Sequence, residues 1–152
     1  MGIESSTRFP DDFDGIIAGA PGVDFNNLVS ARARYYTITG NSTSPNFITG
    51  TLWSVIHDEI IKQCDTIDGV ADGILENPSI CKFNPKTMLC PTRVAANCLT
   101  SAQIEIVQEV FSDFRYPLLN TLIYPAMQPG SEVLSATRLY AGVPFAYSEV
   151  WT

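Results

Sequence analysis

Three aspartates lie close together near the middle of the sequence, at spacings of three and four residues. They are Asp65, Asp68 and Asp72, and a glycine follows each of the last two. Carboxylates this close repel one another unless a cation lies between them. Glycines allow sharp turns with positive φ, which can also direct backbone carbonyls inward. Because Ca²⁺ takes about six to eight hard oxygen ligands, this pattern indicates a calcium-binding loop.

The same three aspartates would also share one face of a helix, and an acidic helical face is usually only solvated. Gly69 and Gly73 argue against that alternative, because a glycine inside a helix costs about 1 kcal/mol relative to alanine. The spacing also differs from the D-x-D-x-D-G pattern of an EF-hand. The prediction is therefore a calcium loop that is not an EF-hand.

All four cysteines lie near this stretch, at Cys64, Cys81, Cys90 and Cys98. They lack the C-x-x-C spacing of metal sites, and His57 is the only histidine, which argues strongly against a zinc or redox protein. Disulfides are the better interpretation, and they indicate an oxidising compartment. Three pairings are possible, of which the sequential one makes two compact loops. Its first loop would close around the acidic turn and stabilise the fold by about 3 kcal/mol.

Two further features bear on export. Asn41-Ser42-Thr43 is an acceptor tripeptide for N-glycosylation within a polar loop, which agrees with secretion. Residues 1–8 have no apolar core and no cleavage site, so they are not predicted to be a signal peptide. A chain that has lost its beginning would explain both observations.

The composition excludes several classes of function. The 152 residues are 45% hydrophobic, enough for the core of one domain or for a piece of a larger one. The net charge of −7 argues against a nucleic-acid partner, whose phosphates require basic contacts. Neither a run of basic residues nor an apolar stretch of 18 residues is present, so a membrane is not an expected partner.

Four elements should position the acidic loop. Residues 14–22 form a short apolar run that predicts a strand buried on both faces, as in a parallel sheet. Helices are expected from about residue 25 with Asp24 as its cap, over 51–63 with Thr51 as its cap, and from a Thr100–Gln103 capping box. Their apolar stripes are Leu28, Ala31 and Tyr35; Leu52, Val55, Ile56 and Ile60; and Ile104, Val107, Phe111 and Phe114.

The remaining segments have weaker patterns. Residues 77–99 contain three prolines and three of the cysteines, so they are expected to be irregular and stapled by disulfides. Residues 118–124 could form a short strand. His57 falls on the polar side of its helix, where a lone histidine is far more often a surface residue than a catalyst.

Two stretches resemble one known family. Residues 8–21 resemble the segment after the nucleophile helix in the tannase and feruloyl esterase family, and residues 64–75 with Cys81 resemble that family's calcium loop. The resemblance implies a fragment of a secreted α/β-hydrolase, which cleaves esters of aromatic acids. Residues 1–23 would be a remnant of the catalytic domain. Residues 24–152 would be a mixed α/β, disulfide-stapled lid with its calcium loop at 64–81.

The resemblance also implies a ligand set and a disulfide pattern. The side chains of Asp65, Asp68 and Asp72 and the backbone carbonyls of Val70 and Ile74 would bind a structural Ca²⁺. Glu76 suits the chemistry but does not belong to the family's ligand set. Cys64 would pair with Cys81, and Cys90 with Cys98.

The family's catalytic residues have no counterparts in this sequence. The nucleophile lies in a G-C-S-x-G-G motif upstream of the position of Arg8, and the catalytic Asp and His follow the lid. Ser5 and Ser6 have no G-x-S-x-G elbow around them, and His57 does not match the family histidine. The expectation is a carboxylic ester hydrolase that uses a serine acyl-enzyme in its full-length parent. The 152 residues alone would be inactive.

A different class of function fits the same residues. The chain could be a calcium-stabilised, disulfide-bonded binding module without catalysis. The predicted strand at 14–22 favours the esterase fragment, because a free-standing module has no need of a lone parallel strand. The aromatic-acid ester is thus the expected substrate of the parent, and the sequence does not indicate an oligomeric state.

Overall fold

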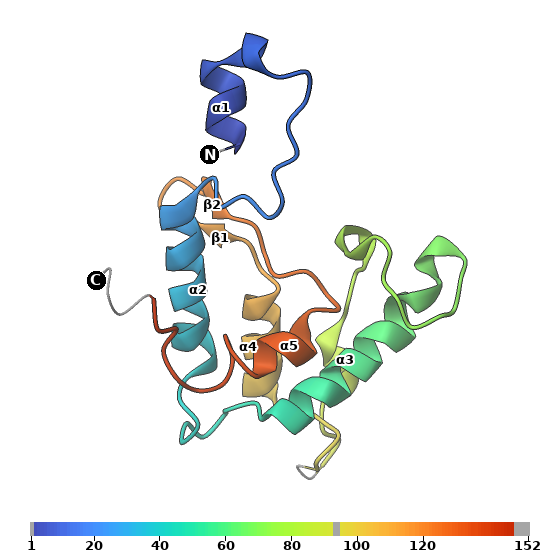
Figure 1. Ribbon diagram of the computed structural model, residues 1–152. Helices are drawn as coiled ribbons and strands as arrows, with labels where there is room; N and C mark the ends of the chain where they lie inside the picture. The colour runs from blue at the N-terminus through green and yellow to red at the C-terminus, as the bar shows by residue number, and fades with distance from the viewer. Residues whose placement is uncertain (1, 93–94, 148–152) are drawn as a thin grey trace.

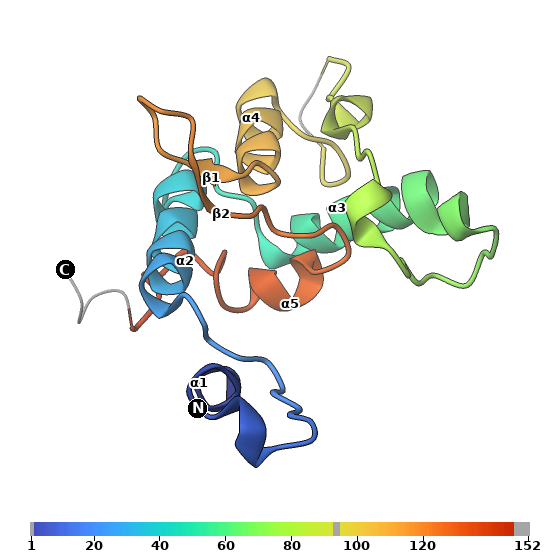
Figure 2. The ribbon, with the colours of Figure 1, turned by 90° about the horizontal axis from the view of Figure 1, so that it is seen from above.

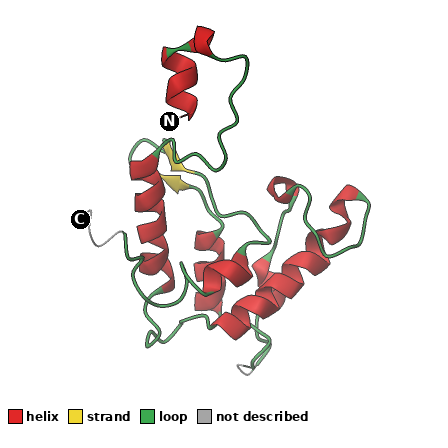
Figure 3. Ribbon diagram, viewed as in Figure 1, coloured by secondary structure: helices red, strands yellow, loops and turns green. Residues whose placement is uncertain are grey.

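The computed structural model describes residues 2–92 and 95–147 (Figure 1). Helices dominate, and the strands form a single two-stranded antiparallel sheet (Figure 3). The α-helices are α1 (Gly2–Arg8), α2 (Phe25–Thr39), α3 (Gly50–Cys64), α4 (Ser101–Val110) and α5 (Glu132–Ala136), and the strands are β1 (Phe114–Arg115) and β2 (Leu122–Tyr124). Short 3-10 helices cover Pro10–Asp12, Asp65–Asp68, Pro78–Ile80 and Pro85–Met88.

Helices α2 to α5 pack around one core, while α1 and the segment after it lie to one side in both views (Figures 1 and 2). Trp53, Ile56 and Ile60 of α3 are completely buried. The ring of Tyr140, which follows α5, lies 4.7 Å from that of Trp53 and 5.4 Å from that of Tyr35 in α2, measured between centroids. One tyrosine near the end of the chain therefore joins two helices from its first half.

The helix starts follow from capping, with one correction. The predicted capping box of Thr100 and Gln103 is confirmed, and both of its reciprocal hydrogen bonds form. The cap of α3 is Thr49 rather than Thr51, because the Thr49 hydroxyl accepts the N–H of Leu52. Gly50 then becomes the first helical residue, and its poor helix propensity hid this start in the sequence.

Two other sequence expectations are also revised. Asp24 occupies the cap position of α2, but its carboxylate accepts the side-chain amide of Asn27 rather than a backbone N–H. Helix α4 ends at Val110, so Phe114 lies in β1 instead of on the helix face. The strand expected within residues 118–124 is β2, which pairs with β1.

The predicted buried strand at residues 14–22 is wrong for this structure. That segment has no strand, and Ile17 is fully exposed. A parallel strand needs neighbours on its hydrogen-bonding edges, and no parallel partner for it occurs within residues 2–92 and 95–147.

None of the helices described is long and apolar enough to cross a membrane.

Candidate metal centre

The acidic loop begins where α3 ends. The 3-10 helix Asp65–Asp68 continues directly from Cys64, and Gly69 ends it with φ of 95°. Gly73 has φ of 77°. Both glycines therefore adopt the left-handed region, where a side chain would be strained. The helical alternative for these aspartates is restricted to one 3-10 turn.

Each of the three aspartates uses one carboxylate oxygen to hold the loop backbone. Oδ1 of Asp68 accepts the N–H of Val70 at 2.9 Å, and Oδ1 of Asp72 accepts that of Ile74 at 3.0 Å. Oδ1 of Asp65 reaches eight residues along the chain to the N–H of Gly73, at 2.8 Å. This last bond brings the start and the end of the acidic stretch together.

The donor set is suited to a hard cation. In the described part of the chain, the second oxygens of the three carboxylates have no hydrogen-bond partner, and no lysine or arginine forms an ion pair with them. Val70 and Ile74 are more than half exposed, and their carbonyls accept no hydrogen bond there. The residues therefore fit Ca²⁺ by chemistry and by charge.

The ligands are not gathered around a common point. Within residues 2–92 and 95–147, no group of three or more acidic, histidine or cysteine side chains lies close enough to hold a metal ion. All three carboxylates lie on one loop of about ten residues, tied by the Asp65 bond to Gly73.

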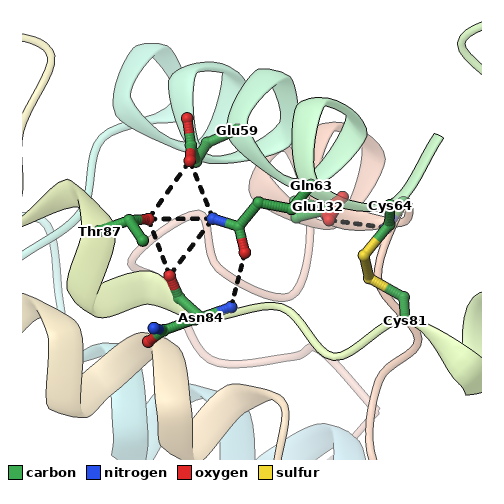
Figure 4. The surroundings of a disulfide bond; sticks show 8 residues. Glu59, Gln63, Cys64, Cys81, Asn84, Thr87 and Glu132 are labelled. Atoms are coloured by element: carbon green, nitrogen blue, oxygen red, sulfur yellow. Dashed lines mark hydrogen bonds between the residues drawn. A yellow bond between two sulfur atoms is a disulfide. The ribbon is translucent and has the colours of Figure 1, made fainter. Parts of the chain in front are cut away.

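Two disulfides form with the pairing that the family resemblance implied, and the first of them brackets this region. Cys64 is bonded to Cys81, and Cys90 to Cys98. The first bridge ties the end of α3 to the segment after the acidic loop (Figure 4). The loop is therefore closed covalently across a sequence separation of 17 residues.

A side-chain network beside the first bridge holds the segment after Cys81, at Asn84 and Thr87, on α3 (Figure 4). The Gln63 side chain accepts the N–H of Asn84 at 2.9 Å and donates to Thr87 Oγ1 and Glu59 Oε1, each at 2.9 Å. The hydrogen bond from Gln63, followed by that from Lys62, holds the pKa of Glu59 below its usual value. The network is thus strongest with Glu59 ionised.

The most deeply buried ionisable group was not identified from the sequence. Glu132 has no exposed surface. Its Oε1 accepts the N–H of Gly130 at 2.7 Å, and its Oε2 lies 3.1 Å from Nδ1 of the half-buried His57. The weak periodicity after residue 130 gave no sign that a glutamate would be inside. In the sequence Glu132 follows Ser131 and is 75 residues from His57, so no local signal marked it as buried.

The partner of His57 in this structure is the buried Glu132. Its ring bonds Glu132 across the α3–α5 contact, and Ser6 donates its hydroxyl to the backbone oxygen of Ile3 within α1. Among the described residues, no serine is hydrogen-bonded to the histidine. The part of the chain that the structure describes thus holds no serine–histidine pair for acyl transfer.

An open cleft of about 390 Å³ lies between the acidic loop and the turn before α5. Ile74 and Leu75 line one side and Gly130 the other. A Cβ added to Gly130 would contact Cδ1 of Leu75 at 3.5 Å. The end of the acidic loop is therefore in contact with the same turn that Glu132 holds through the Gly130 N–H.

The sequence matches one protein family over almost its whole length. Residues 1–147 match the family described as tannase and feruloyl esterase. A probable feruloyl esterase B-2 of Aspergillus flavus is 54% identical over 152 residues, and one of Aspergillus terreus is 49% identical over 155. Each match covers 99% of this chain and 29% of the relative.

The fold agrees with the same family. The crystal structure of feruloyl esterase B from Aspergillus oryzae is similar with a TM-score of 0.91 and 46% identity, over 99% of this chain and 30% of that one. A second esterase structure from the same organism gives the same TM-score at 44% identity. The chain thus spans less than a third of the length of the relatives it matches. On these matches, the chain belongs to the tannase and feruloyl esterase family.

Proposed function

We propose that these 152 residues are the calcium-bearing lid, with a short catalytic-domain remnant, of a carboxylic ester hydrolase acting on esters of aromatic acids. The observation that carries this proposal is the 54% identity to a probable feruloyl esterase, over 99% of the chain. Residues 1–23 form the remnant and residues 24–152 the lid. The separation of α1 from the core of α2 to α5 supports this division (Figure 2).

In this proposal, the acyl transfer is carried out by residues outside this segment. The serine nucleophile, its histidine base and the orienting aspartate belong to the remainder of the esterase. The lid contributes walls to the substrate site. A cleft lined by Phe83 and Phe111, whose rings meet edge to face at 6.0 Å, is one aromatic surface that it offers.

Calcium is proposed as a structural ion of the lid. Asp65, Asp68 and Asp72 would hold it through their side chains, and Val70 and Ile74 through their carbonyls. The unpaired second carboxylate oxygens support this set. The two positive charges of the ion would offset most of the charge of three carboxylates that have no basic partner in the described residues, and this chain's own residues would keep the loop closed around it.

Calcium is expected to stabilise the oxidised protein, and the effect should depend on Asp68. At about 100 times the dissociation constant, a ligand raises the free energy of unfolding by about 2.7 kcal/mol. The measurement is thermal unfolding with Ca²⁺ and with a chelator. The Asp68→Ala variant should lose the calcium-dependent shift.

Glu76→Ala is the matched control, because Glu76 is acidic, exposed and close to the loop but outside the proposed ligand set. That variant should keep the full calcium response. If both variants lost the calcium-dependent stabilisation equally, the ion would be held by general charge attraction and not by the proposed ligands. A melt indifferent to Ca²⁺ would contradict the metal assignment.

The esterase role is tested by a chimera. This chain replaces the matching segment of the Aspergillus oryzae feruloyl esterase B, whose structure is similar over 99% of it. The chimera is expected to hydrolyse methyl ferulate, because the grafted segment restores a lid of the same fold. The 152-residue polypeptide alone is expected to show no hydrolysis.

The outcomes separate the proposal from a non-catalytic calcium-binding module. A chimera that folds cooperatively and responds to Ca²⁺ but does not hydrolyse the ester would favour the module. Hydrolysis by the 152 residues alone that is lost on replacement of Ser5 and Ser6 would show that the chemistry resides within this chain. Export of the parent protein is part of the proposal, and the two disulfides support it.

A further inference from the structure

The loop between α2 and α3 holds a motif that plays no part in the proposed ester hydrolysis. Asn41-Ser42-Thr43 is the only Asn-x-Ser/Thr tripeptide in the sequence whose middle residue is not proline. We propose that Asn41 carries an N-linked glycan and that its side chain has two separate roles. Its Oδ1 holds the loop, while its Nδ2 holds the glycan.

The amide oxygen of Asn41 organises the turn. It accepts the N–H of Thr43 at 2.9 Å, the hydroxyl of Thr43 at 2.6 Å and the hydroxyl of Ser44 at 3.4 Å. The backbone N–H of Ser44 also bonds the carbonyl of Asn41 at 2.9 Å. The side-chain oxygen thus replaces backbone partners in a short polar loop, as asparagine commonly does.

The amide nitrogen is left for solvent. Asn41 is exposed, and its Nδ2 has no hydrogen-bond partner among the residues that the structure describes. Transfer from an oligosaccharide carried on a lipid diphosphate would form a bond from Nδ2 to the anomeric carbon. The bond from that carbon to the diphosphate breaks, Nδ2 loses one proton, and the lipid diphosphate departs. The three hydrogen bonds to Oδ1 all survive this reaction.

Gly142, from the segment after α5, packs closely against this loop. A Cβ added to Gly142 would lie 2.6 Å from the backbone nitrogen of Ser42 and 3.0 Å from the ring of Phe47. In Figure 1 this loop lies at the opposite end of α2 from α1. A glycan on Asn41 would therefore be attached at the end of α2 opposite residues 1–23, the proposed remnant of the catalytic domain.

A second asparagine provides an internal comparison. The hydroxyl of Ser79 donates to Oδ1 of Asn77, so Asn77 makes the same kind of side-chain contact as Asn41. Pro78 occupies the middle position and excludes Asn77 from the acceptor motif. Replacing Pro78 by alanine creates a second acceptor in the same chain.

The inference rests on the proposed export, but its test supplies export independently. The chain is produced in yeast behind a cleavable secretion leader, and the secreted protein is analysed by intact-mass and peptide mass spectrometry. Treatment with peptide-N-glycosidase is expected to remove a glycan and to convert Asn41 into aspartate. The Pro78→Ala variant is expected to carry a second glycan at Asn77.

An unmodified Asn41 in a Pro78→Ala protein that is glycosylated at Asn77 would overturn the proposal. The two roles are separated by unfolding measurements on unglycosylated variants. Asn41→Asp keeps an oxygen acceptor and should melt like the enzymatically deglycosylated protein, whereas Asn41→Ala should melt lower by about 3 °C. Equal melting of these two variants would refute the role of Oδ1.

Discussion

Replacing Cys64 and Cys81 together by alanine is expected to lower the free energy of unfolding by about 3 kcal/mol, because the bridge closes a loop of 17 residues. The same change should weaken calcium binding. Only noncovalent contacts would then hold the far end of the acidic loop, so the ion would have to order a less constrained segment. Urea unfolding at saturating Ca²⁺ and in chelator measures both effects on the same variant.

The second disulfide is the matched control. Cys90 and Cys98 are only eight residues apart, so removing their bridge should cost about 2.5 kcal/mol and should leave calcium affinity unchanged. The difference in calcium affinity is the informative quantity, because the expected stability losses are similar. Equal loss of affinity in both double variants would contradict a specific role of the Cys64–Cys81 bridge in holding the loop.

Trp53→Ala is expected to reduce the free energy of unfolding by about 3–5 kcal/mol, as for other buried aromatic residues truncated to alanine. The side chain is completely buried, and its ring packs on Tyr140 at 4.7 Å. The cavity would open where α3 meets the last part of the described chain. Denaturant unfolding monitored by far-UV circular dichroism gives the loss without relying on the removed fluorophore.

Two further variants keep this prediction testable if Trp53→Ala does not fold. Trp53→Phe retains most of the packing and removes an indole N–H that has no partner in the described residues, so it should cost much less than Trp53→Ala. Leu118→Ala changes a side chain that is 85% exposed and should stay within about 0.5 kcal/mol of the wild type. If Leu118→Ala lowered the free energy of unfolding as much as Trp53→Ala, the core around Trp53 would not be the main source of stability.

Local sequence signals predicted the parts of this fold that local physics determines. The Thr100–Gln103 capping box needs only residues three apart, and it forms as expected. The start of α3 was placed two residues late, because Gly50 separates the true cap from the apolar stripe. The disulfide pairing came from the family resemblance, since spacing alone left three possibilities open.

The features that the sequence did not predict depend on contacts between residues far apart in the chain. Tyr140 and Glu132 lie in a segment of weak periodicity, and their burial depends on α3, more than 70 residues earlier. The strand expected at residues 14–22 failed for the converse reason. Its apolar pattern is local, but a parallel strand exists only with neighbours that the described residues do not provide.

The place of Tyr140 near the end of the chain has a consequence for the order of events during synthesis. The ring that joins α2 to α3 leaves the ribosome about 100 residues after Asn41, a delay of about 5–20 s at ordinary elongation rates. Until then, the hydrophobic faces of α2 and α3 cannot close on their common partner. The core of α2 to α5 is therefore expected to close only after Tyr140 has been synthesised, and until then its earlier helices remain accessible to processing enzymes and to chaperones.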